Sequence, residues 1–302
     1  MSITALVKSM RLRTLPLSLA GVLLGGALGL SNGSVSWGAC LFLLLTTAAL
    51  QVLSNMSNEL GDYRSGVDGD GRQGPNYSLA EGGLTERQMV GSIKGVAVAC
   101  CIFGLAMIFF SFGNLWQWQP LLFIALGATA IWAATHYTLG KHPYGYRGWG
   151  DLFVFIFFGL VSVMGSYYIT AHTISPLLCL AAAGIGLLSV GVLNVNNIRD
   201  MKSDAGLRRT VPLIIGAHKA KIYQTVLVVV GFALVYAYVI VKGCTVQNTR
   251  FLWLPILTLP VFVRHLVGVW RNSDRALDPM LPQLVISTFL LSLFTVIACY
   301  GL

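Results

Sequence analysis

The sequence predicts an all-α, polytopic membrane protein in which nine transmembrane helices form one bundle, with Asp-rich loops on a single membrane face. Composition is the first observation. Of the 302 residues, 56% are hydrophobic and only 10% are charged, whereas a soluble domain carries about a quarter charged residues. The other two observations are long stretches without any charged residue and turn-forming residues near the middle of each stretch. We expect residues 1–302 to form a single transmembrane domain.

Three uncharged stretches define the first six helices. They are residues 14–58, 95–140 and 152–198, which are 45, 46 and 47 residues long. One membrane-spanning helix needs about 20 residues, so each stretch suits two spans. Turn formers near their middles are Ser31 to Ser34, Gly113 with Asn114 and Pro120, and His172 to Pro176. Each stretch is therefore predicted to be a helical hairpin that leaves the membrane on the side where it entered.

The rest of the chain predicts three further spans. Residues 222–241 form an uncharged run, and residues 279–302 form another at the end of the sequence. Between them, residues 251–270 are apolar but are interrupted by Arg264 and His265. Nine helices result, which places the two ends of the chain on opposite faces of the membrane.

The basic residues predict which face is cytoplasmic. In this topology 18 of the 20 Lys and Arg residues lie on the face of the N-terminus, and only Lys242 and Arg250 lie opposite. Cytoplasmic loops carry an excess of Lys and Arg, so we expect an inner-membrane protein with the N-terminus and the Asp-rich loops in the cytoplasm and the C-terminus outside. The net charge of +9 is explained by this asymmetry and does not indicate nucleic acid. No small-residue cleavage site follows the first apolar run, so a removable signal peptide is not expected.

A first polar cluster follows the second predicted helix. Asn55, Asn58 and Asp62 are spaced i, i+3 and i+7, which places them on one face of a helix. Asp68 lies six residues after Asp62 and would point elsewhere on a continuous helix. Gly66 can bend the backbone there and return Asp68 toward the others.

A second cluster repeats this spacing after the sixth predicted helix, at Asn197, Asp200 and Asp204. Acidic residues often only solvate loops, but two matching clusters, each preceded by asparagines in an apolar helix, favour a metal site. Mg²⁺ prefers oxygen ligands and is usually shared between one or two carboxylates and substrate phosphates. The two clusters therefore predict magnesium ions that hold a diphosphate between them.

Several stretches resemble the UbiA superfamily of intramembrane prenyltransferases, and within it the branch that prenylates 1,4-dihydroxy-2-naphthoate in menaquinone biosynthesis. The resemblance covers roughly two-thirds of the chain. The matching stretches are Arg11–Pro16, Leu53–Asp62, Tyr144–Asp151, Val163–Ser166 and Leu193–Asp200. Glu59 replaces the Asp that usually follows Asn58 in the motif. Asp62 and Asp68 are separated by five residues where the superfamily usually has three, and this longer spacing is similar to the naphthoate branch.

The resemblance implies roles for individual residues. The implied metal ligands are Asn58, Asp62, Asp68, Asp200 and Asp204. The implied substrate-binding residues are Asn58, Arg72, Tyr137, Lys141, Arg209 and Arg11, with Tyr137 and Lys141 near the diphosphate. The four aspartates and Lys141 are the implied catalytic set.

The implied activity is the Mg²⁺-dependent transfer of a polyprenyl group from polyprenyl diphosphate to 1,4-dihydroxy-2-naphthoate, giving demethylmenaquinone. Membrane lipid is the expected environment of the prenyl tail, and no nucleic-acid partner is expected. One alternative is a related prenyltransferase with another aromatic acceptor. A membrane transporter is a second, but transporters place ionisable groups near the bilayer midplane, whereas these carboxylates lie at helix ends.

Overall fold

The computed structural model describes residues 2–30, 36–67, 77–246 and 250–300. These residues form helices and no β-strand, and nine of their helical segments are long and apolar enough to cross a membrane, as the sequence predicts. The uninterrupted long helices are α2 (Leu15–Leu30), α3 (Trp37–Arg64), α4 (Glu86–Phe112), α5 (Trp118–His136), α8 (Leu178–Arg199), α11 (Ala217–Val246), α12 (Leu259–Arg271) and α13 (Met280–Tyr300). The predicted turn at Ser31 to Ser34 lies outside the described residues.

The remaining span is composite. It consists of α6 (Gly150–Val154), the π-helix η3 (Phe155–Gly165) and α7 (Ser166–Ala171), which follow one another without a gap. The shorter elements are α1 (Ile3–Met10), η1 (Leu12–Thr14), η2 (Tyr144–Tyr146), α9 (Met201–Asp204), α10 (Val211–Ile215), η4 (Leu254–Thr258) and η5 (Asp274–Leu277). The eighth span begins with η4 at Leu254, three residues later than predicted.

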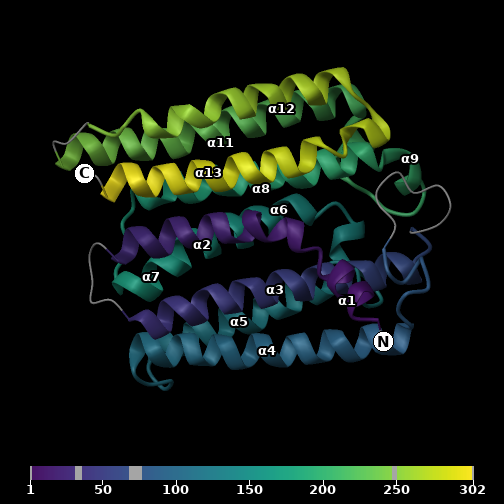
Figure 1. The fold of residues 1–302 in the computed structure, drawn as a ribbon, viewed down its shortest axis with the longest axis horizontal. Helices are drawn as coiled ribbons and strands as arrows, with labels where there is room; N and C mark the ends of the chain where they lie inside the picture. The colour runs from purple at the N-terminus through teal and green to yellow at the C-terminus, as the bar shows by residue number, and fades with distance from the viewer. Residues whose placement is uncertain (1, 31–35, 68–76, 247–249, 301–302) are drawn as a thin grey trace.

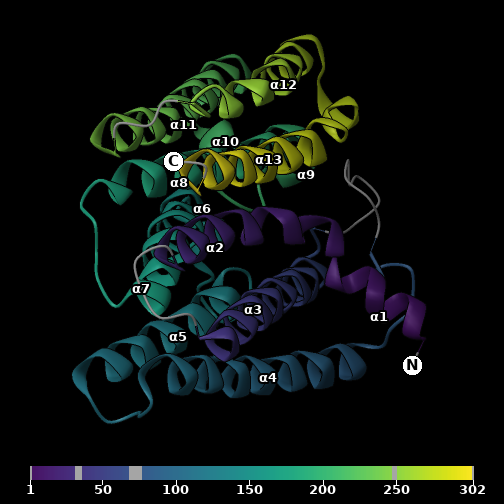
Figure 2. The same ribbon diagram turned by 60° about the vertical axis from the view of Figure 1, so that its left-hand side comes forward.

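The helices form three layers (Figures 1 and 2). Helices α8, α11, α12 and α13 lie on one side, α3, α4 and α5 lie on the other, and α2 with the α6–η3–α7 span lies between them. Leu24, Val163 and Ile185 are fully buried where the middle layer meets α8. The largest core cluster therefore joins the middle layer to the C-terminal helices.

Small residues allow the middle layer to pack closely. A Cβ atom added at Gly25 of α2 would lie 1.9 Å from the carbonyl oxygen of Val163. One added at Gly159 of η3 would lie 2.6 Å from the Cα atom of Gly186 in α8. Close backbone approach through small residues is a common way for membrane helices to associate. These contacts fix the position of η3 between its neighbours.

Two groups of exposed tryptophans mark the ends of the bundle. Trp37, Trp116 and Trp118 lie at the beginnings of α3 and α5, and Trp149 and Trp270 lie at the beginning of α6 and the end of α12. Tryptophan is enriched at both membrane–water interfaces. Many exposed Leu, Ile, Val and Phe side chains lie on the helices between these groups, as expected for a surface that faces lipid.

The connections with the acidic residues gather at one end of the bundle, at the right in Figure 1 with α1 and α9. The Ser65 hydroxyl after α3 lies 2.9 Å from the Tyr146 hydroxyl after α5. The backbone N–H of Arg209 donates to the carbonyl oxygen of Tyr146 over 2.9 Å. The loops after α3, α5 and α8 are thus joined to one another.

Candidate functional site

The Asn55, Asn58 and Asp62 positions of the first cluster lie on the last three turns of α3, because this helix continues without a break to Arg64. Asp62 is almost fully buried, and its Oδ1 accepts a 2.8 Å hydrogen bond from the Tyr146 hydroxyl. Asn58 Oδ1 accepts a 3.3 Å hydrogen bond from the Thr138 hydroxyl. A Cβ atom at Gly61 would collide with Thr138, so Gly61 allows α3 to approach the segment after α5 and brings Tyr146 to Asp62.

The other residues predicted to accompany this cluster differ in their placement. Asn55 Nδ2 donates to the carbonyl oxygen of Met10 and to the Thr14 hydroxyl, both over 2.9 Å, so this side chain holds the N-terminal segment. Gly66 has φ 76°, which confirms the predicted bend of the chain. Asp68 and Arg72 lie outside the described residues.

Glu59 is fully buried, and its Oε1 accepts a 2.9 Å hydrogen bond from the backbone N–H of Leu79. It is directed at the 77–84 loop. This contact holds that loop against α3 and accounts for an acidic residue at a position that does not face Asp62.

The second cluster lies at the end of α8. The helix ends at Arg199, Asp200 leaves the helical region (φ −92°, ψ 6°), and the single turn of α9 carries Asp204. The repeated i, i+3, i+7 spacing of Asn197, Asp200 and Asp204 therefore spans two helical segments, α8 and α9, that are interrupted at Asp200. Arg199 binds the Asp200 carboxylate next to it and also Asp278 in the loop before α13, and these contacts hold Asp200 at the end of the helix.

Arg199 is one of the most buried large side chains of the protein. Its Nε and Nη2 donate to Asp200 Oδ1 and Oδ2 over 2.8 and 2.7 Å. Its Nη1 donates to Asp278 over 2.6 Å, and Nη2 also reaches Asn196 Oδ1. Asp200 is thus held by a bidentate pair, and Arg199 joins α8 to the loop before α13.

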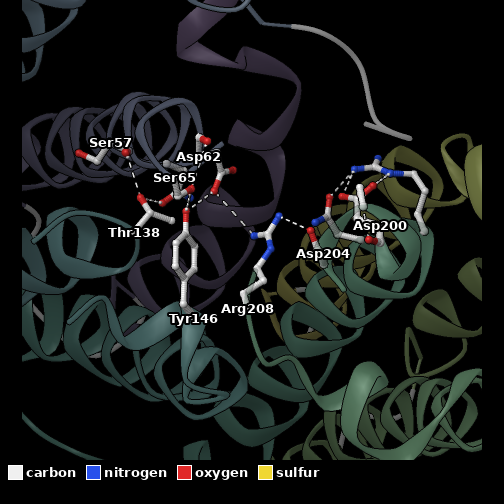
Figure 3. A network of polar contacts seen from close by, with 12 residues as sticks. Ser57, Asp62, Ser65, Thr138, Tyr146, Asp200, Asp204 and Arg208 are labelled. Carbon is white, nitrogen blue, oxygen red and sulfur yellow. Dashed lines mark hydrogen bonds and ion pairs between the residues drawn. The ribbon is translucent and has the colours of Figure 1, made fainter. Parts of the chain in front are cut away.

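Arg208 lies between the two clusters (Figure 3). Its Nη2 lies 2.7 Å from Asp204 Oδ1, and its Nη1 lies 3.8 Å from Asp62 Oδ1. Its Cζ lies 5.6 Å from the centre of the Tyr146 ring. One guanidinium group therefore contacts carboxylates that come from α3 and α9, which are far apart in the sequence.

Burial controls the protonation of this centre. Asp204 is fully buried, and beyond the Arg208 ion pair neither of its oxygens accepts a hydrogen bond from the described residues. Burial raises the pKa of Asp204 to about 6, Arg208 opposes this rise, and Asp200 and Asp62 add to it. Burial and the charge of Asp62 also raise the pKa of Tyr146, so its hydroxyl stays protonated and donates to Asp62.

Lys141, Arg209 and Arg11, which the sequence predicts as substrate-binding residues, form no ion pair with Asp62 or Asp204 within the described part of the chain. Lys141 and Arg209 are exposed, and neither side chain forms an ion pair with another described residue. Arg11 places its Cζ 3.5 Å from the centre of the Tyr77 ring, and its Nε and Nη2 are buried without a hydrogen-bond partner among the described residues. Sequence reasoning selected Arg209 and missed Arg208, although the i, i+4 spacing of Asp204 and Arg208 was an available signal.

Tyr137 connects the polar centre to an apolar chamber. Its phenol is buried among Arg208, Asp62, Asp151 and Asp204, and burial is the main cause that raises its pKa. Below it, a cavity of about 500 Å³ extends between α2, α3, α4, α5 and η3. Asn58 and Tyr137 line this cavity together with side chains that are mostly apolar.

The donors at this centre fit a divalent cation that is shared with a ligand. No three His, Cys, Asp or Glu side chains converge on one point among the described residues, so these residues do not form a complete metal cage. Asp62 and Asp204 offer hard oxygen donors from opposite sides, and the oxygens of Asp204 are buried without hydrogen bonds. Mg²⁺ is commonly bound by one or two carboxylates together with phosphate oxygens.

The chain is similar to known proteins in both sequence and fold. A 1,4-dihydroxy-2-naphthoate octaprenyltransferase from Escherichia coli strain K12 is 35% identical over 298 residues, which cover 98% of this chain and 95% of that protein. The apo structure of a UbiA homologue from Aeropyrum pernix K1 superposes with a TM-score of 0.67 at 14% identity, covering 95% of this chain and 96% of the other. A UbiA homologue from Archaeoglobus fulgidus bound to DMAPP and Mg²⁺ gives 0.58 at 15% identity, covering 99% and 100%. Residues 18–298 match the UbiA prenyltransferase family, and the chain belongs to this family.

Proposed function

We propose that this protein transfers a polyprenyl group from polyprenyl diphosphate to 1,4-dihydroxy-2-naphthoate and so produces demethylmenaquinone for menaquinone biosynthesis, with Mg²⁺ as cofactor. One observation carries the proposal. Asp62 and Asp204 contact the same guanidinium group above an apolar chamber of about 500 Å³. A prenyl diphosphate has the same two parts, a polyanionic head and an apolar tail. The relative from Escherichia coli, which carries the naphthoate activity in its name, supports this choice of acceptor.

The residues of the acidic centre are proposed to have two roles, holding Mg²⁺ and orienting the carboxylates that hold it. Asp62 and Asp204, with Asn58, Asp68 and Asp200, would hold Mg²⁺, which when bound neutralises the diphosphate and makes it a better leaving group. Tyr146 keeps Asp62 oriented by its 2.8 Å hydrogen bond. Arg199 does the same for Asp200 through two hydrogen bonds.

The basic residues would bind the diphosphate oxygens. Arg11 has buried N–H groups without hydrogen-bond partners among the described residues, which supports a role for it in binding an anionic ligand. Lys141, Arg72 and Arg209 are proposed to complete the set, with Tyr137 at the boundary between head and tail. Arg donates two parallel hydrogen bonds to phosphate, and Lys acts as a point charge.

The apolar chamber would hold the reacting end of the prenyl chain away from water. Each buried CH₂ group contributes about 0.8 kcal/mol of binding free energy. The C–O bond breaks with its electron pair on the diphosphate, the electron-rich ring of the acceptor attacks the resulting allylic cation, and the ring loses its carboxylate as CO₂, which gives the hydroquinone form of demethylmenaquinone. Exclusion of water from this chamber protects the cation from hydrolysis.

The proposal includes a location for the whole chain. Residues 1–302 would form one prenyltransferase domain in the inner membrane, with the N-terminus and the acidic loops in the cytoplasm and the C-terminus outside. The distribution of Lys and Arg supports this orientation.

Product analysis by mass spectrometry tests the proposal. Membranes containing the protein are supplied with Mg²⁺, a polyprenyl diphosphate and either dihydroxynaphthoate or hydroxybenzoate. We expect prenylated product from dihydroxynaphthoate only, and a loss of at least about 100-fold in the Asp62→Asn variant, because a transition-state electrostatic contact is removed. Turnover of hydroxybenzoate but not of dihydroxynaphthoate would show that the proposed acceptor is wrong. Full activity of Asp62→Asn would show that the proposed site is wrong.

A further inference from the structure

We propose that Arg208 is an internal counter-cation of the two acidic clusters, which a divalent metal ion must displace from Asp62 and Asp204 before it can bind between them. The inference rests on the proposed function, because it requires a metal ion at this centre. It adds a competition between a residue of the protein and the metal ion for the same carboxylate oxygens.

The contacts of Arg208 place its positive charge at the point where the two clusters meet. Nη1 and Nη2 face Oδ1 of Asp62 and Oδ1 of Asp204, at 3.8 and 2.7 Å. A metal ion that joined these two carboxylates would need the same oxygens, because Mg²⁺ binds oxygen at about 2.1 Å. Guanidinium and metal ion therefore exclude one another from this position.

Arg199 provides an internal comparison. It is fixed on several sides, since it binds Asp200, Asp278 and Asn196. In contrast, Arg208 has a buried Nε without a hydrogen-bond partner among the described residues. It forms two ion pairs with them, one with Asp62 and one with Asp204. Arg199 is therefore fixed in place, whereas the ion pairs of Arg208 within the described part of the chain are with the two carboxylates that the metal ion would bind.

Charge gives the exchange a direction. Arg208 supplies one positive charge against two carboxylates, and a divalent ion supplies two. A displaced guanidinium remains beside the centre and has five N–H donors that match phosphate oxygens. Metal binding would thus release Arg208 to bind the diphosphate, so metal ion and diphosphate should each favour binding of the other.

Binding of Mn²⁺ alone tests the exchange without any turnover. The electron paramagnetic resonance signal of free Mn²⁺ measures the affinity of the purified full-length protein. We expect Arg208→Gln to bind Mn²⁺ on the order of tenfold more tightly than the wild type, a difference of about 1.4 kcal/mol. Lys202→Gln is the matched control, because it removes one positive charge from the adjoining α9 turn, and the ion pair that Lys202 forms within the described residues is with Asp274 at the surface.

A second measurement uses inorganic pyrophosphate. In the wild type Mn²⁺ should strengthen pyrophosphate binding, and this enhancement should fall several-fold in Arg208→Gln. Arg208→Lys, which keeps the charge but cannot contact both carboxylates with two nitrogens, should also bind Mn²⁺ more tightly and replaces the Gln variant if that one does not fold.

The outcomes separate the two proposals. Equal or weaker Mn²⁺ binding by the Arg208 variants, or an equal gain in Lys202→Gln, would overturn the displacement while leaving the proposed function intact. Failure of the wild type to bind Mn²⁺ even with inorganic pyrophosphate present would overturn both.

Discussion

At the scale of single residues, the burial of Asp204 has a consequence for stability. Its pKa of about 6 lies above the ordinary value of 3.8 because burial disfavours the charged form. Between these two values the folded protein binds this proton and the unfolded chain does not. The contribution of Asp204 to folding is therefore favourable at low pH and is lost as the pH rises through about 6. A bound divalent ion needs the ionised form and offsets this loss.

The pH dependence of metal binding follows. We expect the affinity for Mg²⁺, measured as the rise in thermal unfolding temperature on titration, to be nearly constant above about pH 7. Below about pH 6 it should fall by about tenfold per pH unit, because binding must release the Asp204 proton. Asp204→Asn should bind Mg²⁺ weakly at every pH. An affinity in the wild type that is the same at about pH 5 and about pH 8 would show that Asp204 does not bind the ion.

Residue roles are where sequence reasoning reaches its limit. The sequence identified Asp62 and Asp204, which the structure places around one guanidinium group. It selected Arg209 and not Arg208. Which of these adjacent residues faces the carboxylates depends on the turn at Gly206 (φ 82°) and on the backbone contact of Arg209 with Tyr146. Neither feature can be predicted from the spacing of charges.

At the scale of helices, the contact between η3 and α8 sets the position of the middle layer. Gly159 and Gly186 allow the two backbones to meet, with Ala182 beside them. The π-helix gives the span a wider turn and re-aims its side chains, and such turns occur often at functional sites. Residues of η3 such as Phe157 and Val161 line the chamber, so a shift of η3 would change the chamber directly.

Gly159→Ala tests this contact. The added Cβ would lie 2.6 Å from Gly186 Cα and 2.7 Å from the Ala182 carbonyl oxygen, so we expect a loss of about 1–3 kcal/mol in stability, measured by thermal unfolding in detergent. Gly95→Ala in α4 is the control, since nothing lies within 4 Å of its new Cβ. That change should be neutral or stabilising by up to about 1 kcal/mol. Equal stability of the two variants would show that the middle layer can move apart freely.

The existence of the helices was predictable, but their internal irregularities were not. Absence of charge over 45 to 47 residues requires two spans whatever the local geometry, so the hairpins follow from length alone. The π-helix depends on packing against Gly186, and the break at Asp200 depends on Arg199 and its distant partner Asp278. Both need long-range contacts that hydrophobic patterns do not contain.

At the scale of the whole molecule, the acidic residues that the structure describes lie at one end of the bundle, together with most of the described basic residues. The opposite end carries exposed Trp37, Trp116 and Trp118, and the described residues there have little charge. Such a distribution suits a membrane protein with one chemically active face. Whether that face is cytoplasmic is a prediction from the Lys and Arg asymmetry.

Labelling with a membrane-impermeant maleimide in intact cells tests the orientation. In a background without other cysteines, the exposed native Cys244 at the end of α11 should react from outside. A cysteine placed at Lys202, whose side chain is 70% exposed, should react only after permeabilisation. The reverse pattern would place the acidic loops outside and contradict the proposed location.

The loop before α13 supports the acidic centre, although the last helices contribute no predicted metal ligand to it. Asp278 and Asp274 bind Arg199 and Lys202. A polypeptide shortened after α11 would retain the carboxylates of Asp62, Asp200 and Asp204 but would lose Asp278, which holds Arg199 in place against Asp200. We expect such a fragment to be defective even if it inserts correctly. Helices α12 and α13, with the loop between them, therefore help to position the residues of the reaction centre as well as span the membrane.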